Sequence, residues 1–200
     1  INQIAAGEVI HRPASIVKEL IENSIDAKAN NIQIIIKDAG KILVQIIDDG
    51  MGMSDRDAEI CFQKHTTSKI KETIDIMKIS TMGFRGEALA SIASISEVEL
   101  KTKNKKDKLG TLINIENSKI KKNEKIATSQ GTSISVKNLF FNIPARKKFL
   151  KSDKIEMKHI LEVFMQLAIA NYQIGFKLMD NNQTIYNLSK TNLKQRIIQL

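Results

Sequence analysis

The chain has 200 residues, of which 42% are hydrophobic and 4% aromatic, and its formal net charge is +9. This length supports one globular domain with a sizeable core, or one domain and the start of another. The excess of cations favours an acidic partner such as a nucleic acid or a nucleotide, and no apolar run is long enough to cross a membrane. The single cysteine, Cys61, excludes an intrachain disulfide and a cysteine-rich zinc site, so a reducing compartment is expected.

The first predicted element is an amphipathic helix that begins at Pro13, a residue suited to a first helical turn. Its apolar residues recur at helical spacing: Ile16, Val17, Leu20, Ile21 and Ile25. At about 100° per residue, Glu19 and Asn23 lie one turn apart at the border of this apolar face. Lys18 and Glu22 are expected to point further toward solvent. A partly desolvated carboxylate suits a proton acceptor and an Asn oxygen suits a divalent cation, but ordinary surface residues fit the pattern too.

Two apolar runs follow, and the residues 38–41 between them predict a β-hairpin. Alternate residues of the second run are expected to share one buried face: Ile42, Val44, Ile46 and Asp48. A carboxylate that ends a buried row needs donors, either turn amides or a ligand N–H. Gly50 and Gly52 come next and allow the backbone to approach a flat or bulky group. The chain has no Walker A motif and no GxGxxG turn, so a P-loop or Rossmann nucleotide site is excluded.

A helix is predicted from Ser54 to Lys64, and the segments HTTSKI and TMGFRGEALASIASIS come after it. In the second segment Gly83 and Gly86 lie just before an apolar helix, Ala88 to Ile95. A glycine-rich loop at a helix N-terminus is a ready anion site, because its amides and the helix dipole both attract negative charge. A flexible loop with a capped helix is the plain alternative.

The segments VELKTK, TLINIE and TSISV are predicted strands joined by long loops. Nine lysines and no aromatic residue occur between Lys101 and Lys125, which indicates either an electrostatic nucleic-acid contact or a solvated loop. The candidate DNA-contacting residues are Lys103, Lys105, Lys106 and Lys108. A helix from about Asp153 to Ala170 and a hairpin around residues 180–182 complete the pattern. Mixed order of strands and helices favours a mixed sheet covered by helices on one face. We expect one domain over residues 1–190 and the truncated start of another over 191–200.

Five segments, in this order and spacing, resemble a known family: NQIAAGEVIHRPASIVKELIENSIDA, DDGMGM, HTTSKI, GFRGEALASIASIS and NIPARKKFL. They are similar to the N-terminal ATPase region of MutL-type mismatch-repair proteins, within the GHKL group shared by gyrase B, Hsp90 and histidine kinases. The resemblance implies an α+β fold, a two-layer sandwich with a mixed, mostly antiparallel sheet of about eight strands (the Bergerat fold). Three residues depart from the family pattern: Asp49 for Asn, Lys28 for Gly and Ile143 for Thr. Asp49 would bring extra negative charge near the nucleotide.

The resemblance implies roles for particular residues. Glu19 would be the general base that activates the attacking water, and Asn23 would be a Mg²⁺ ligand. Asp48 would accept a hydrogen bond from the adenine amino group, with room provided by Gly52 and support from Thr132. The remaining nucleotide-binding positions implied by the family are Ala27, Thr67, Ser68, Lys69, Gly83, Phe84, Arg85, Gly86, Glu87, Ala88 and Leu89. Most of these belong to a lid and to the helix start that close over the phosphates.

By resemblance, the chain would bind and slowly hydrolyse Mg·ATP to drive lid closure, N-terminal self-dimerisation and engagement of DNA and of the mismatch-recognition protein MutS. A bacterial cytoplasm is the implied location, and any nuclease activity would lie outside this chain. Two alternatives stay open: another ATPase of this fold, of chaperone or kinase type, or a non-catalytic basic DNA-binding module. A Mg²⁺-dependent nucleotide titration separates the last of these from the other two.

Overall fold

A computed structural model describes residues 10–63 and 87–200. In it an eight-stranded sheet runs in the order β5-β4-β3-β6-β2-β1-β7-β8. The strands are β1 (Asn31–Lys37), β2 (Leu43–Asp48), β3 (Glu97–Lys103), β4 (Gly110–Glu116), β5 (Lys119–Ile126), β6 (Gly131–Lys137), β7 (Gly175–Asp180) and β8 (Gln183–Leu188). Strands β1 and β7 pair in parallel, whereas the other neighbouring pairs in the described ranges are antiparallel. The expected mixed, mostly antiparallel sheet of an α+β fold is therefore confirmed.

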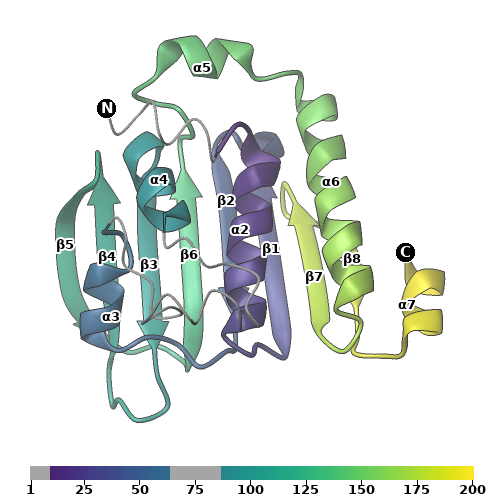
Figure 1. Cartoon of the computed structure of the whole chain (residues 1–200), viewed down its shortest axis with the longest axis horizontal. Helices are drawn as coiled ribbons and strands as arrows, with labels where there is room; N and C mark the ends of the chain where they lie inside the picture. Colours follow the sequence, from purple (N-terminus) through teal and green to yellow (C-terminus); the bar gives the residue numbers. More distant parts are fainter. Residues whose placement is uncertain (1–9, 64–86) are drawn as a thin grey trace, which may run out of the picture.

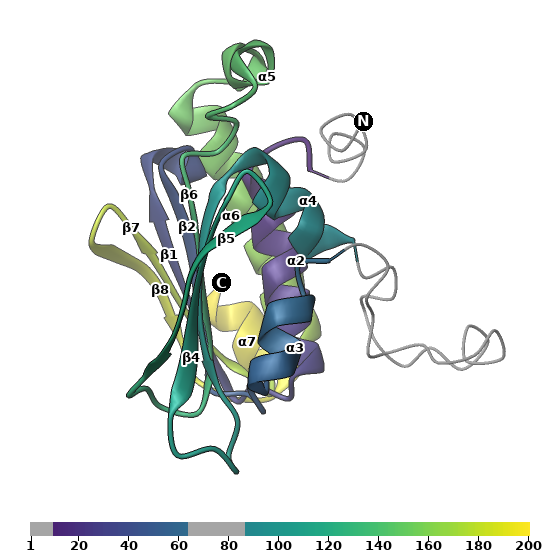
Figure 2. The same ribbon diagram turned by 90° about the vertical axis from the view of Figure 1, so that its left-hand side faces the viewer.

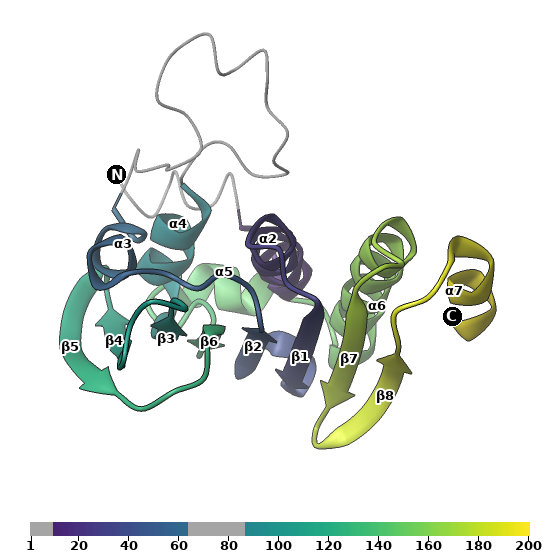
Figure 3. The ribbon, with the colours of Figure 1, turned by 90° about the horizontal axis from the view of Figure 1, so that it is seen from below.

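Helices cover one face of this sheet, which gives the molecule two layers (Figures 1 and 2). They are α2 (Pro13–Asp26), α3 (Asp55–Ile60), α4 (Ala88–Ile95), α6 (Asp153–Ala170) and α7 (Leu193–Gln199), while α5 (Pro144–Phe149) projects beyond the end of the sheet. A three-residue 3-10 turn, Asp38–Gly40, joins β1 to β2 in the predicted hairpin. Seen from below, α2 and α4 lie side by side over the middle of the sheet (Figure 3).

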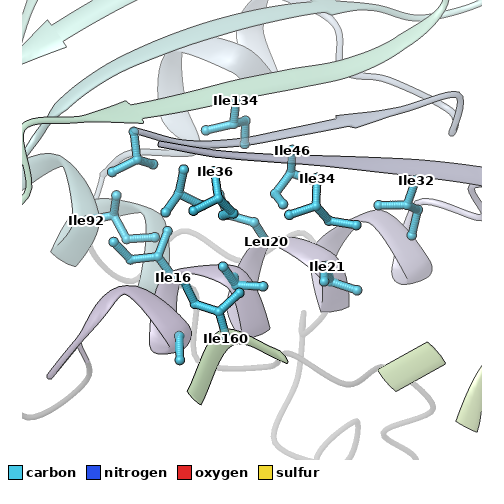
Figure 4. Close-up of a cluster of buried hydrophobic side chains, with 14 of the residues drawn as sticks. Ile16, Leu20, Ile21, Ile32, Ile34, Ile36, Ile46, Ile92, Ile134 and Ile160 are labelled. Atoms are coloured by element: carbon cyan, nitrogen blue, oxygen red, sulfur yellow. The ribbon is translucent and has the colours of Figure 1, made fainter. Parts of the chain in front are cut away.

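The core lies between α2 and the sheet, as the helical spacing of its apolar residues predicts. Pro13 lies in the first turn, and Ile16, Val17, Leu20 and Ile21 are buried, whereas Ile25 in the last turn is only half-buried. They pack against alternate residues of β1, Ile32, Ile34 and Ile36, each at most 1% exposed (Figure 4). Burial of side chains of this size stabilises by about 1.5–3 kcal/mol each.

Two expectations about strands are wrong. Ile42 precedes β2 and is 49% exposed, so the buried row of that strand begins at Val44. Residues 119–126, expected in a long loop, form the edge strand β5. Their sequence KIKKNEKI has no apolar alternation because nearly every side chain is exposed, and backbone pairing with β4 holds the strand. Lysines on an edge strand also discourage pairing with another chain.

The final helix, α7, is attached to the domain by the fully buried Arg196. Its guanidinium donates to the carbonyl oxygens of Ala168, Tyr172, Ile174 and Ser189 at 2.7–3.2 Å. The first of these carbonyls belongs to the last turn of α6, where the helix dipole favours a cation. Arg196 therefore joins α7, α6 and the end of β8.

Candidate nucleotide site

The centre of the site is a carboxylate at the end of β2. Asp48 Oδ2 accepts a hydrogen bond of 2.8 Å from Ser24 Oγ on α2, and Oδ1 accepts one of 2.9 Å from the Gly50 amide. The Thr132 amide on β6 also donates to this carboxylate. The side chain that sequence reasoning placed in need of donors thus has three donors, from a helix, a turn and a neighbouring strand.

The electrostatics of Asp48 are set mainly by burial. Desolvation raises the pKa of its carboxyl above the ordinary value of 3.8, and the donors of Gly50, Ser24 and Thr132 only partly oppose this shift. A carboxylate with two oxygens offers about four lone-pair positions, so three donors leave about one acceptor position. Asp48 therefore has capacity for one more N–H.

A pair of threonines supports the strand beside Asp48. Thr102 on β3 is 1% exposed, and its Oγ1 accepts from the Met53 amide at 2.9 Å. The same oxygen lies 3.0 Å from the Gly131 carbonyl oxygen and 3.1 Å from Thr132 Oγ1. These contacts join β3, β6 and the turn after β2, so they fix the position of Thr132 next to Asp48.

The glycines after Asp48 allow segments of this chain to pack closely. A Cβ at Gly52, whose φ is +66°, would lie 2.0 Å from the Lys103 carbonyl oxygen. A Cβ at Gly50 would lie 2.7 Å from the carbonyl oxygen of Ala27, which accepts the Met51 amide at 2.9 Å. The close approach that these glycines permit is thus to the chain's own backbone. Ala27 contributes that carbonyl at the end of α2.

Two residues that depart from the family pattern concern the α2–β1 connection: Lys28 lies in it, and Asp49, which follows β2, binds its backbone amides. Asp49 accepts from the amides of Asn30 and Asn31 and from the Asn31 side chain at 2.7–2.9 Å. Although desolvation opposes them, these donors lower the pKa of Asp49. The extra charge of Asp49 is therefore directed at this loop. Lys28 has a φ of +60°, a conformation that suits glycine, which explains why a glycine fits this position well.

The two residues at the border of α2 lie where the helical pattern predicts. The Glu19 side chain is 27% exposed, and Asn23 follows it by one turn and is also half-buried. Glu22 was expected to face solvent, and this is wrong: its side chain is only 11% exposed and lies 3.0 Å from Lys18 Nζ. Lys18, one turn earlier in the helix, places its ammonium group beside this carboxylate.

The first turn of α4 contains the other described candidates. Glu87 is the N-cap residue, and Ala88 and Leu89 begin the helix, all three half-buried. An N-terminus of this kind presents backbone amides that suit an anion. The candidates Thr67, Ser68, Lys69, Gly83, Phe84, Arg85 and Gly86 lie outside the described residues. Ser54 caps α3, as predicted, by accepting from the Asp57 amide, but the helix ends at Ile60 and not at Lys64.

The candidate DNA-contacting lysines lie at the end of the sheet where β3 meets β4. Lys103 ends β3 beside Gly52, while Lys105, Lys106 and Lys108 are exposed in the following loop. Other lysines of this region already have acidic partners: Lys101 pairs with Glu99, and Lys122 with Glu124. Lys119 and Lys121 on β5 are exposed as well, so exposure alone does not distinguish the four candidates from these two lysines.

A divalent cation would depend on more than protein carboxylates here. Within residues 10–63 and 87–200, no group of three His, Cys, Asp or Glu side chains has metal-binding geometry. Asn23 offers a neutral oxygen, and magnesium commonly takes one or two protein ligands together with phosphate oxygens. The residues present therefore fit a metal that arrives with a nucleotide.

Sequence reasoning missed Ser24 and Thr102, although both carry a signal. Ser24 lies four and seven residues after Leu20 and Val17, on the buried face of α2, where a hydroxyl needs a partner. Thr102 shares parity with Val98 and Leu100 on the buried face of β3. A hydroxyl on a buried face is thus the sign of these supporting residues.

Comparisons with known proteins identify the family and the fold. Residues 11–147 match the family described as histidine kinase-, DNA gyrase B-, and HSP90-like ATPase. The DNA mismatch repair protein MutL of Christiangramia forsetii is 56% identical over 98% of this chain and 32% of that protein, and MutL of Flavobacterium psychrophilum is 53% identical over 100% and 32%. The chain thus spans about a third of the length of these curated relatives.

Solved structures give the same result. The Aquifex aeolicus MutL ATPase domain, solved in complex with ADP, superposes with a TM-score of 0.79 at 31% identity, over 96% of this chain and 69% of that chain. The N-terminal domain of a DNA repair protein superposes with a TM-score of 0.83 at 30% identity, over 99% and 59%. The fold and the carboxylate site define an ATPase domain of the histidine kinase, gyrase B and HSP90 class. Within that class, the chain belongs to the MutL family.

Proposed function

We propose that this domain binds ATP with its adenine at Asp48 and its phosphates between α2 and the start of α4. The observation that carries the proposal is the half-buried carboxylate with capacity for one more donor. The adenine amino group supplies such an N–H on an otherwise flat, weakly polar ring. The ADP complex of the Aquifex aeolicus relative supports a nucleotide in this fold.

The same carboxylate selects among bases. A guanine presents a carbonyl oxygen where adenine has its amino group, so two acceptors would face each other and leave Asp48 without its donor. An unpaired buried polar group costs about 1–3 kcal/mol, which corresponds to a preference of roughly tenfold to a hundredfold. Ser24 and Thr132 hold the carboxylate in the position that this selection requires.

Glu19 and Asn23 provide the chemistry along α2. Glu19 accepts the proton of the water that attacks the γ-phosphate, and its half-buried carboxylate suits this role. Asn23, one turn later, offers its side-chain oxygen to Mg²⁺. When bound, Mg²⁺ would neutralise charge that develops on the phosphates. The amides at the start of α4 bind phosphate oxygens, with Glu87, Ala88 and Leu89 at the contact.

We propose a wider role in DNA mismatch repair from the names of the relatives, which are three times longer than this chain. In the full-length protein, ATP binding closes a lid, promotes self-dimerisation and permits contact with DNA and MutS. We assign the described residues to one ATPase domain, and we include the residues after 190 in it, because Arg196 on α7 is buried against α6 and the end of β8. In the described part of the chain, no helix combines the length and apolar character of a membrane span. A bacterial cytoplasm, beside the nucleoid, is the proposed location.

The deciding experiment compares two glutamates on one helix. Glu19→Gln is expected to leave Mg·ATP affinity nearly unchanged while hydrolysis falls by about 10²-fold or more, because a general base acts in the transition state. Glu22→Gln is the matched control, since Glu22 contacts Lys18 and has no role in the proposed chemistry. Calorimetric titration and phosphate release measure the two effects. Equal loss of binding and turnover in Glu19→Gln would remove the general base from this residue.

A further inference from the structure

A cavity of about 210 Å³ lies between the start of α2, the helix α5 and the first turn of α6. Arg12, Arg146, Phe149 and Glu156 are among its lining residues. Arg12 is the N-cap residue of α2, whereas Ser24 is in the last turn of that helix. A helix of 14 residues is about 21 Å long, so the cavity is well separated from the adenine end of the nucleotide site.

Two buried polar atoms around this cavity have no hydrogen-bond partner among the described residues. Glu156 is 1% exposed; its Oε1 accepts from the Lys151 amide at 2.9 Å, but Oε2 is unpaired. Arg146 Nη1 is unpaired as well. One atom is an acceptor and the other a donor, and leaving either without a partner costs about 1–3 kcal/mol. Both atoms have almost no accessible surface in the free protein, so a ligand that offers one donor and one acceptor would satisfy them after a shift of the surrounding side chains.

The surface around the cavity is basic and carries one prominent aromatic ring. Helix α5 has no acidic residue and no buried residue, and Lys147 and Lys148 on it are exposed. Lys151 and Lys154 add positive charge, and the exposed Asp153 between them is paired with Lys41. Phe149 is 80% exposed although it lies at the rim of the cavity. Helix α5 projects beyond the sheet, so a partner can reach it (Figures 1 and 2).

We propose that this cavity and α5 form a docking site for an acidic, extended peptide segment of a partner protein. A peptide N–H donates to Glu156 Oε2, a peptide carbonyl or an acidic side chain accepts from Arg146 Nη1, and an apolar side chain packs on Phe149. Acidic side chains of the partner face Lys147 and Lys148. A peptide offers a donor and an acceptor at nearly every residue, whereas a phosphodiester backbone offers acceptors only and would be repelled by the Glu156 carboxylate.

The test uses two labelled probes with the 200-residue protein: a short synthetic peptide of alternating aspartate and leucine, and an oligothymidylate of equal net charge. Fluorescence anisotropy is expected to show saturable binding of the peptide that is at least tenfold tighter than binding of the oligonucleotide. Phe149→Ser, an exposed change that leaves the core intact, is expected to weaken peptide binding about threefold to tenfold. Lys119→Gln on the distant strand β5 is the control and should have no effect.

Glu156→Gln separates specific docking from simple charge attraction. It removes one negative charge, so non-specific attraction of an acidic peptide would become stronger. The proposed site predicts the opposite, a loss of at least tenfold, because one acceptor oxygen is replaced by a donor. Arg146→Lys is a second variant, which keeps the positive charge but loses the planar N–H donors of the guanidinium. Thermal unfolding checks that each variant is folded. Absence of saturable peptide binding, tighter binding of the oligonucleotide, or tighter binding in Glu156→Gln would overturn the proposal.

Discussion

Ser24 Oγ lies 2.8 Å from Asp48 Oδ2, and this contact joins the helix of Glu19 to the end of strand β2. The same hydroxyl lies 3.1 Å from the Leu20 carbonyl oxygen, which is the ordinary partner of a serine inside a helix. A hydroxyl carries one proton, and the shorter contact to the charged oxygen takes it. The proposed general base, Glu19, and the residue that holds the proposed base-recognition carboxylate, Ser24, therefore lie on one helix, five residues apart.

Replacement of Ser24 by Ala should weaken adenine nucleotide binding by roughly threefold to thirtyfold. The change removes a hydrogen bond to a charged group, which contributes about 1–2 kcal/mol, and frees the carboxylate to rotate. Titration calorimetry with ADP measures the effect. Ser15→Ala in the first turn of the same helix serves as the control. An unchanged affinity in Ser24→Ala would show that Gly50 and Thr132 alone hold Asp48.

The pH dependence of the site follows from the raised pKa of Asp48, which burial moves above 3.8. Folding favours the protonated carboxyl, so its contribution to the free energy of unfolding is fully present below the unfolded pKa and is lost as pH rises through the folded pKa. Adenine binding is expected to have the opposite pH dependence, because the ionised carboxylate is the form that accepts a hydrogen bond from the amino group. Adenosine affinity should therefore fall as pH is lowered through the raised pKa, whereas the free energy of unfolding gains from the same protonation. Asp48→Asn should bind adenine nucleotides weakly at every pH and show neither trend, and a flat adenosine profile in the unsubstituted protein would contradict this assignment.

Lys28→Gly should stabilise the domain by up to about 1 kcal/mol. Lys28 occupies a left-handed conformation that costs a side-chain-bearing residue about 1 kcal/mol or more, partly offset by the larger entropy of unfolded glycine. Urea unfolding measures the change. Lys28→Ala keeps a Cβ in the same conformation and should bring no gain. A gain of equal size in both variants would place the effect in the lysine charge instead.

Arg196→Met should destabilise the domain by about 3 kcal/mol or more, because four buried or partly buried carbonyl oxygens lose their donor. The ring of Phe176, 5.6 Å from the guanidinium carbon, also loses its cation contact. Lys194→Met on the exposed side of α7 is the matched control. Both are compared by denaturant unfolding, and similar midpoints for the two variants would mean that water replaces the guanidinium at little cost.

The lysines after β3 should contribute a salt-dependent, sequence-independent affinity for DNA. Replacing Lys103, Lys105, Lys106 and Lys108 together by Gln should weaken binding and flatten the dependence of log affinity on log salt, since each phosphate contact releases counterions. Lys119, Lys121 and Lys122 on β5, changed in the same way, provide a control of similar charge. If both variants lose the same slope, net charge rather than this loop is responsible.

Much of the fold could be predicted because its signals are local. Helix α6 has the predicted bounds, Asp153–Ala170, and the hairpin at residues 38–41 pairs as expected. Strand β5 could not be predicted, because an edge strand with both faces exposed needs no alternation of apolar residues. Its existence depends on backbone hydrogen bonds to β4, which leave no pattern in side chains.

The site residues also divide into those that local patterns predict and those that depend on tertiary contacts. The positions of Glu19, Asn23 and Asp48 follow from the periodicity of one helix and one strand. The Ser24 contact required knowing that this helix crosses this strand, and the burial of Glu22 required knowing where the Lys18 side chain folds. Periodicity assigns a residue to a face; tertiary packing decides which partner it meets there.

The parallel pairing of β1 with β7 determines the order in which the domain can be completed during synthesis. Ile32 on β1 pairs with Phe176 on β7, a partner that the ribosome adds long after β2 and β6 have emerged. Until then, one hydrogen-bonding edge of β1, a strand with four isoleucines, stays open in a state that invites pairing with other chains. A nascent chain halted before β7 should therefore need chaperone protection. The sheet is completed only when the segment 175–188 has left the ribosome and paired with β1.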